Sequence, residues 1–156
     1  DLSIAGYEEE EPNAALSRKK PEQIYQEGKR IWGQGFINRK QGNYKRILTE
    51  SFVLIKQAAE ENYPLAEFDL STMYRDGIGV EPNPGEYVKW ARRSAEHNCG
   101  SAQNEMGVIY EYGIEGVIEP NKEEAIRYYT QAMNQGVPVS IANLERIIEA
   151  EEDTRE

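Results

Sequence analysis

The sequence has little of the chemistry that builds metal and catalytic sites. Its 156 residues include one cysteine, Cys99, and one histidine, His97. A single cysteine excludes an internal disulfide framework and a zinc site made of several cysteines. A single histidine excludes paired-histidine metal motifs and leaves few ways to assemble a catalytic triad. No apolar run reaches the roughly 18 residues that a membrane-spanning helix needs.

Basic residues are also scarce overall, and they are unevenly placed. The chain has 28 acidic and 18 basic residues, which gives a formal charge of −10. Residues 1–16 carry −5, residues 17–46 carry +7, and the remainder is acidic again. The acidic total argues against nucleic-acid binding by the whole surface. Apolar residues make up only 38% of a chain long enough for one domain, which favours an elongated shape with much surface per residue.

What the sequence does contain is a repeat. Residues 62–97 align with residues 98–135, with an offset of 36 positions that becomes 38 after a two-residue insertion. A degenerate copy precedes these two, and a third copy that begins at Gly136 ends after one helix. The two clear copies share the following special residues: Ala66 and Ala102, Leu70 and Met106, Tyr74 and Tyr110, Gly77 and Gly113, and Glu-Pro-Asn at 81–83 and at 119–121.

The spacing inside each copy is helical, because Ala66, Leu70 and Tyr74 follow one another at four-residue steps. Asn or Gly follows the second helix of each copy and predicts a left-handed cap. The glycines between the two helices predict turns with positive φ, and Asn83 and Asn121 have N-cap spacing to a glutamate. The predicted helices cover residues 21–34, 43–61, 64–75, 84–97, 101–112, 122–135 and 138–150.

These elements predict an all-α fold, a short right-handed α/α solenoid of about three helical hairpins with a C-terminal capping helix. One hairpin cannot bury its own apolar stripe, so neighbouring hairpins must stack. We expect Ile141, Leu144, Ile147 and Ile148 to form the stripe that closes the last hairpin. The predicted division is an N-terminal tail at 1–20, a solenoid at 21–150 with units at about 21–62, 63–98, 99–136 and 137–150, and an acidic tail at 151–156.

The repeat resembles a known family. It reads A-x-x-x-L-x-x-x-Y-x-x-G-x-G-V, then a short turn, then A-x-x-W/Y-x-x-x-A-A/M-x-x-G/N. This pattern is similar to the Sel1-like repeat (SLR), an α/α repeat related to tetratricopeptide repeats. The resemblance covers 64–136 well, 21–62 loosely and 137–150 as a half repeat. Tyr87 departs from it, since a small residue is usual at that position.

The resemblance implies a non-catalytic adaptor that binds other proteins, in bacterial envelope systems or in eukaryotic quality-control complexes. The family has no shared catalytic centre, so the resemblance implies no enzyme activity, no catalytic residue, no metal and no cofactor. It favours the bacterial periplasm or envelope as the compartment, with the cytoplasm as the alternative.

A stacked array of hairpins offers a groove lined by the first helix of each unit, where a partner segment can lie. Residues of those helices outside the packing register are the candidate binding residues. An alternative function is an inhibitor or regulatory subunit that blocks a partner enzyme through its acidic surface. The candidate groove residues are Tyr25, Lys29, Glu67, Ser71, Arg75, Gln103, Glu111 and Tyr112.

Tyr112 and Tyr129 are aromatic where the other copy has Asp76 and Ala91. An aromatic side chain that the repeat register does not require is a candidate for contact with a partner, because tyrosine is favoured in interfaces.

The basic stretch at 17–46 interleaves its charges with aromatic residues, among them Tyr25, Trp32, Phe36 and Tyr44. Such a pattern is compatible with single-stranded nucleic acid, an anionic membrane, an acidic protein segment or a plain solvated face. The acidic body disfavours phosphate ligands, so a protein or peptide partner is expected and nucleic acid is not. The composition of residues 1–20 is typical of disorder. A further hypothesis is that this tail docks on the solenoid, its own or a neighbouring molecule's.

Overall fold

The structure is a computed structural model that describes residues 18–153, so the hypothesis about the first 17 residues of the tail lies outside the described residues. This part of the chain is helical throughout, apart from short connections and an isolated β-bridge between Ile114 and Ile118. Its seven helices are α1 (Pro21–Ile37), α2 (Tyr44–Glu60), α3 (Pro64–Asp76), α4 (Pro84–Glu96), α5 (Gly100–Tyr112), α6 (Lys122–Asn134) and α7 (Pro138–Asp153).

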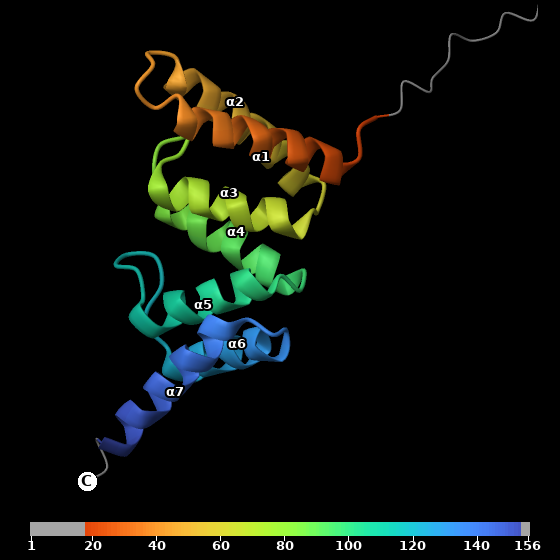
Figure 1. The fold of residues 1–156 in the computed structure, drawn as a ribbon. Helices are drawn as coiled ribbons and strands as arrows, with labels where there is room; N and C mark the ends of the chain where they lie inside the picture. The colour runs from red at the N-terminus through yellow and green to blue at the C-terminus, as the bar shows by residue number, and fades with distance from the viewer. Residues whose placement is uncertain (1–17, 154–156) are drawn as a thin grey trace, which may run out of the picture.

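The helices pack as consecutive antiparallel pairs, α1 with α2, α3 with α4 and α5 with α6, and the pairs stack one on the next (Figure 1). The turns inside the three pairs lie on one side of the stack, and α7 packs on α6 at its end. The predicted all-α solenoid is confirmed. None of the described helices is long and apolar enough to cross a membrane.

Backbone geometry at the helix ends agrees with the residues found there. Asn62, Asn98 and Gly136 follow α2, α4 and α6 with φ of 65°, 67° and 76°, in the left-handed region that Asn and Gly tolerate best. The side chains of Asn83 and Asn121 accept the backbone N–H three residues later, at 3.1 and 3.0 Å. These caps fix where each helix of the repeat begins and ends.

The apolar core runs through the stack instead of lying inside each hairpin. One cluster of buried side chains extends from Ile24 on α1 to Tyr128 on α6. Ala66 and Ala102 are fully buried within it, which lets neighbouring helices approach closely. A smaller cluster joins α6 to α7 and consists of Ala125, Tyr129, Leu144 and Ile147.

The stripe predicted for α7 is half right. Leu144 and Ile147 are buried, whereas Ile141 and Ile148 are 44% and 45% exposed. By the repeat alignment, Ile141 and Ile148 occupy positions that face the second helix of a complete pair. Because α7 is followed by no second helix among the described residues, only its α6-facing side is covered.

Leu144 and Ile148 provide a matched pair for testing this packing. Replacing buried Leu144 with alanine removes apolar contacts and leaves a cavity, so we expect a loss of about 2–4 kcal/mol in the free energy of unfolding. Replacing exposed Ile148 with alanine should cost less than about 0.5 kcal/mol. Urea denaturation of both variants measures the difference. Equal losses would contradict the packing of α7 on α6.

Candidate interaction surface

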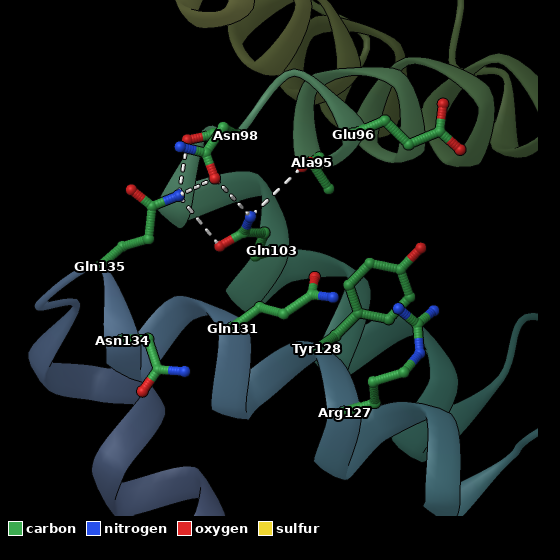
Figure 2. Close-up of a pocket in the computed structure, with 9 residues that line it drawn as sticks. All are labelled: Ala95, Glu96, Asn98, Gln103, Arg127, Tyr128, Gln131, Asn134 and Gln135. Atoms are coloured by element: carbon green, nitrogen blue, oxygen red, sulfur yellow. Dashed lines mark hydrogen bonds between the residues drawn. The ribbon is translucent and has the colours of Figure 1, made fainter.

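Four of the eight predicted groove residues are buried in the solenoid. Glu67 and Ser71 are 0% exposed, and Tyr25 and Gln103 are nearly as inaccessible. The prediction that these four side chains line an open groove is therefore not supported by the structure. Gln103 sits at the inner wall of a cleft beside Asn98 and Gln135 (Figure 2), on the side where α4 and α6 end.

The burial has a simple geometric reason. A first helix inside the stack contacts both the second helix of its own pair and the second helix of the preceding pair. Glu67 and Ser71 directly follow the packing residues Ala66 and Leu70, and their positions still face the second helix of the same pair. Only a narrow strip of each first helix remains open, and the sequence pattern alone does not mark that strip.

The other four predicted residues reach the face formed by α1, α3, α5 and α7, which we call the odd-helix face. The side chains of Lys29 and Arg75 are 40% exposed, and that of Glu111 is 11% exposed. Tyr112, at the end of α5, is 64% exposed. Lys29, Arg75 and Glu111 all take part in ion pairs that join one hairpin to the next.

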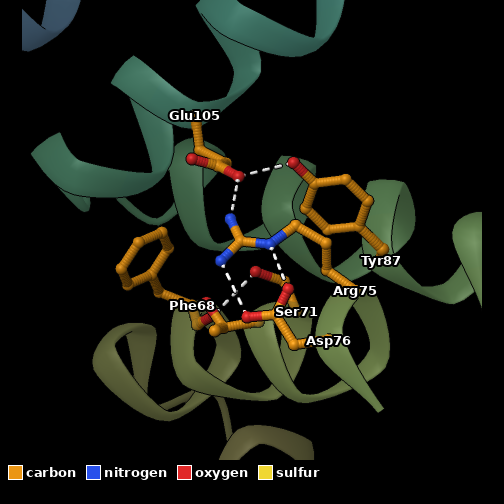
Figure 3. Close-up of polar contacts among 7 residues, drawn as sticks. Phe68, Ser71, Arg75, Asp76, Tyr87 and Glu105 are labelled. Atoms are coloured by element: carbon orange, nitrogen blue, oxygen red, sulfur yellow. Dashed lines mark hydrogen bonds and ion pairs between the residues drawn. The ribbon is translucent and has the colours of Figure 1, made fainter. Parts of the chain in front are cut away.

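The junction between α3 and α5 shows how these ion pairs are built (Figure 3). Arg75 on α3 donates from Nη1 to Oε1 of Glu105 on α5 at 2.6 Å, and its other nitrogens hold Asp76. The hydroxyl of Tyr87 on α4 donates to the same Glu105 oxygen. Tyr87, the residue that departs from the family pattern, thus has a structural role at the junction.

The same three groups occur at the two other junctions. Between α1 and α3, Asp69 accepts from Lys29 Nζ at 2.8 Å and from the Tyr25 hydroxyl at 3.0 Å. Between α5 and α7, Glu111 accepts from Arg146 Nη2 at 2.8 Å and from the hydroxyl of the α6 residue Tyr129 at 2.7 Å. A carboxylate shared by a tyrosine and a cation therefore links each odd helix to the next, and we call the three sites the junction triads.

Several members of the triads have shifted pKa values. The guanidinium of Arg146 is the main cause that lowers the pKa of Glu111, and the Tyr129 hydroxyl adds to this effect. Burial, followed by the neighbouring carboxylate, raises the pKa of Tyr87 and of Tyr129. At neutral pH Glu111 is therefore a charged acceptor, and Tyr87 and Tyr129 are neutral donors, which is the combination that their hydrogen bonds require.

Sequence reasoning missed the carboxylates Asp69 and Glu105, although the repeat contains a signal for them. The two positions are 36 residues apart, so the two copies place an acid at the same site. The prediction that Tyr129 faces a partner is wrong. Its ring is 0% exposed, because it packs against Gly107, where a Cβ atom would lie 2.4 Å from the ring.

The basic stretch is partly neutralised by acids of the solenoid. Arg18 pairs with Glu61 and Lys19 pairs with Glu27. Trp32 is buried as a packing residue, and Lys29 Nζ lies 4.6 Å from the centroid of its ring. An acidic ligand for the remaining exposed bases, which include Arg39, Lys40, Lys45 and Arg46, stays a prediction.

His97 and Cys99 both lie at the junction between the second and third hairpins. His97 Nδ1 is 2.8 Å from Oε2 of buried Glu67, which also binds Arg93. Cys99 is a buried free thiol. Within the described residues, no three His, Cys, Asp or Glu side chains are placed to hold a metal ion together.

The repeat itself matches a known family. The Sel1 repeat pattern fits residues 64–99 and 100–137, which correspond to the pairs α3–α4 and α5–α6. The chain is a Sel1 repeat (SLR) protein.

Solved structures agree with the SLR assignment. A Sel1 repeat protein from Oxalobacter formigenes is 31% identical, with a TM-score of 0.67 over 80% of this chain and 47% of the other. A protective antigen of uropathogenic Escherichia coli with an SLR fold is 30% identical, with a TM-score of 0.63 over 77% of this chain and 24% of the other.

Among curated proteins, chitin synthase regulatory factor 3 of Schizosaccharomyces pombe is 32% identical over 87 residues. That match covers 55% of this SLR chain and 9% of the yeast protein. The chain thus spans less than half the length of each of these three relatives.

The α5–α7 triad predicts how stability depends on pH. The pKa of Glu111 is lower in the folded chain than its unfolded value of about 4.3. The contribution of the ionised Glu111 carboxylate to the free energy of unfolding is therefore fully present above that unfolded value. It is lost as the pH falls through the folded pKa. The variant Glu111→Gln should lose less stability than the wild type between about pH 5 and pH 3, measured by urea denaturation. Glu145→Gln, at an exposed site on α7, is the control and should follow the wild-type curve.

Proposed function

We propose that this chain is a non-catalytic scaffold that holds a protein partner on the odd-helix face. Sel1 repeat proteins generally mediate protein interactions, and their scaffold is typically non-catalytic. The observation that carries the proposal is the series of junction triads. Because the triads tie α1, α3, α5 and α7 together, the face is held at a fixed spacing before a partner arrives, which reduces the entropy lost on binding.

The most accessible anchor on this face is the pair formed by Tyr112 and Arg146. The Tyr112 ring is 64% exposed, and the guanidinium carbon of Arg146 lies 6.0 Å from its centroid. Tyrosine and arginine are enriched among the residues that contribute most to protein–protein binding. Arg146 is also held by Glu111, so this anchor is fixed by the α5–α7 triad.

A regulatory subunit that blocks an enzyme is the second candidate. The observation that favours it is the similarity to a protein named as a regulatory factor of chitin synthase, over part of each chain. The acidic residues of α7 provide the surface for this role, since Glu145 and Glu149 are exposed.

Two variants separate the candidates. Partners are captured from the source organism with the wild-type chain, identified by mass spectrometry, and then titrated against purified variants. Tyr112→Ala should weaken binding by about tenfold, equivalent to about 1.4 kcal/mol, without lowering the melting temperature. Val53→Ala, an exposed residue on α2, is the matched control and should leave the affinity unchanged.

The double variant Glu145→Gln with Glu149→Gln tests the acidic surface. If the double variant no longer binds the partner and the Tyr112→Ala variant binds it with wild-type affinity, the scaffold proposal is overturned in favour of the blocking surface.

A further inference from the structure

A polar cleft of about 450 Å³ lies beside the C-terminal end of α4, between that helix and α6 (Figure 2). Most of its lining comes from α4 and α6, the second helices of their pairs, so the cleft is separate from the Tyr112–Arg146 anchor on the odd-helix face. Side-chain amides dominate this lining. They belong to Asn98, Gln103, Gln131, Asn134 and Gln135.

The preceding hairpin has a closed cluster of charges at the corresponding place. Glu67 is completely buried there and accepts from Arg93 Nε at 2.8 Å, while His97 Nδ1 lies 2.8 Å from its other oxygen. Arg93 also donates from Nη2 to the Asn62 side chain at 2.6 Å. These four side chains satisfy one another, so the site is filled by the protein's own groups.

One repeat later, the same positions carry neutral amides. The equivalent residues lie 36 or 38 positions later in the chain. Three glutamines stand there in place of the carboxylate, the guanidinium and the imidazole, and the asparagine is kept. Gln131 is shorter than the arginine it replaces and carries no charge, so it does not close the site, and the cleft is what remains open. The corresponding pairs are Asn62 and Asn98, Glu67 and Gln103, Arg93 and Gln131, and His97 and Gln135.

The amides at the inner wall are held in place. Gln135 Nε2 donates to the Asn98 carbonyl at 2.7 Å and to the Asn98 side-chain oxygen at 2.6 Å. It also lies 3.3 Å from Oε1 of Gln103, whose own Nε2 donates to the carbonyl of Ala95. Among the described residues, no group hydrogen-bonds the side chain of Gln131. In Figure 2 its amide lies in the middle of the cleft, between this network and Tyr128.

The opposite end of the cleft is charged. Figure 2 shows Arg127 beside the Tyr128 ring and Glu96 above them on α4. Arg127 is already held by Glu124, with Nη2 2.5 Å from Oε2. Glu96 is exposed, and no group within residues 18–150 binds its carboxylate. The free charge at this end is therefore negative.

We propose that this cleft binds an extended polar peptide segment through its main-chain amides, with one lysine or arginine of the segment placed against Glu96 and no other charged residue in the segment. A peptide group has one donor and one acceptor close together, and a glutamine side chain offers the complementary pair. Fixed amides recognise such a group without the desolvation cost of a charge. The site adds a second binding surface to the scaffold and does not depend on the odd-helix face.

The chain itself supplies the test variant. The triple variant Gln103→Glu, Gln131→Arg and Gln135→His rebuilds the charged cluster of the preceding hairpin and should close the cleft. Because the same combination already occurs one repeat earlier, we expect the melting temperature to be kept. Gln131→Arg alone, at a partly exposed position, provides a second variant that blocks the cleft if the triple variant fails to fold.

The probe is a phage-displayed library of random linear peptides selected on the wild-type chain. Selected peptides should be uncharged apart from one Lys or Arg, and should bind the closed-cleft variant at least about tenfold more weakly. Glu96→Gln should weaken the binding of these peptides several-fold, whereas Tyr112→Ala should leave their affinity unchanged. Side-chain NH₂ signals of Gln131 and Gln135 in ¹⁵N-labelled protein should shift on titration.

Two outcomes would overturn the proposal. One is a selection that yields no peptide whose binding depends on the three glutamines. The other concerns the NH₂ signals of Gln131 and Gln135. If N-acetylglucosamine oligomers shift these signals and the selected peptides do not, the cleft would be assigned to saccharides. Because Tyr112→Ala reports separately on the odd-helix face, failure here leaves the scaffold function untouched.

Discussion

The junction between hairpins is the feature on which the whole molecule depends. A single hairpin of this size cannot cover its own apolar stripe, and the buried cluster that runs from α1 to α6 exists only because the pairs stack. Apolar burial contributes roughly 25 cal/mol per Å² and supplies the stability. A partly exposed ion pair contributes only about 0–1 kcal/mol. The junction triads therefore add little to the stability of the stack, and their main effect is to fix the register and spacing in which the odd helices meet.

The charge pattern of the triads supports this view. Arg75 on α3 pairs with an acid on the next odd helix, whereas Glu111, at the equivalent position on α5, pairs with a cation. The ion pair at the α5–α7 junction is thus reversed relative to the pairs at α1–α3 and α3–α5, in which the cation lies on the earlier helix. A hairpin that carries the acid of Asp69 or Glu105, stacked after α5 in place of α7, would bring that acid toward Glu111, and like charges repel. The reversed ion pair therefore distinguishes the last junction from the first two.

Much of the fold follows from local rules that the sequence displays. The four-residue steps of Ala66, Leu70 and Tyr74 and the capping residues Asn62 and Asn98 place each helix to within a few residues. The surface was harder to predict, because exposure of a helix position depends on two neighbouring helices at once. Glu67 has the pattern of a surface charge and is buried, since Arg93 pairs with it from α4 and His97 Nδ1 lies within hydrogen-bond distance. Tyr129 looked like an interface residue and is core, since Gly107 leaves room for its ring.

The contrast between Glu67 and Gln103 shows how one repeat acquires a property that its neighbour lacks. Both side chains occupy the same position and are almost fully buried. A buried carboxylate must be compensated, so the position recruits an arginine and a histidine and the site closes around them. A buried amide needs only hydrogen bonds. The Gln103 amide accepts one from Gln135 and donates one to the Ala95 carbonyl. The helices therefore pack in the same way in both units, while the neutral unit keeps an open cleft whose remaining amide groups are free for another chain.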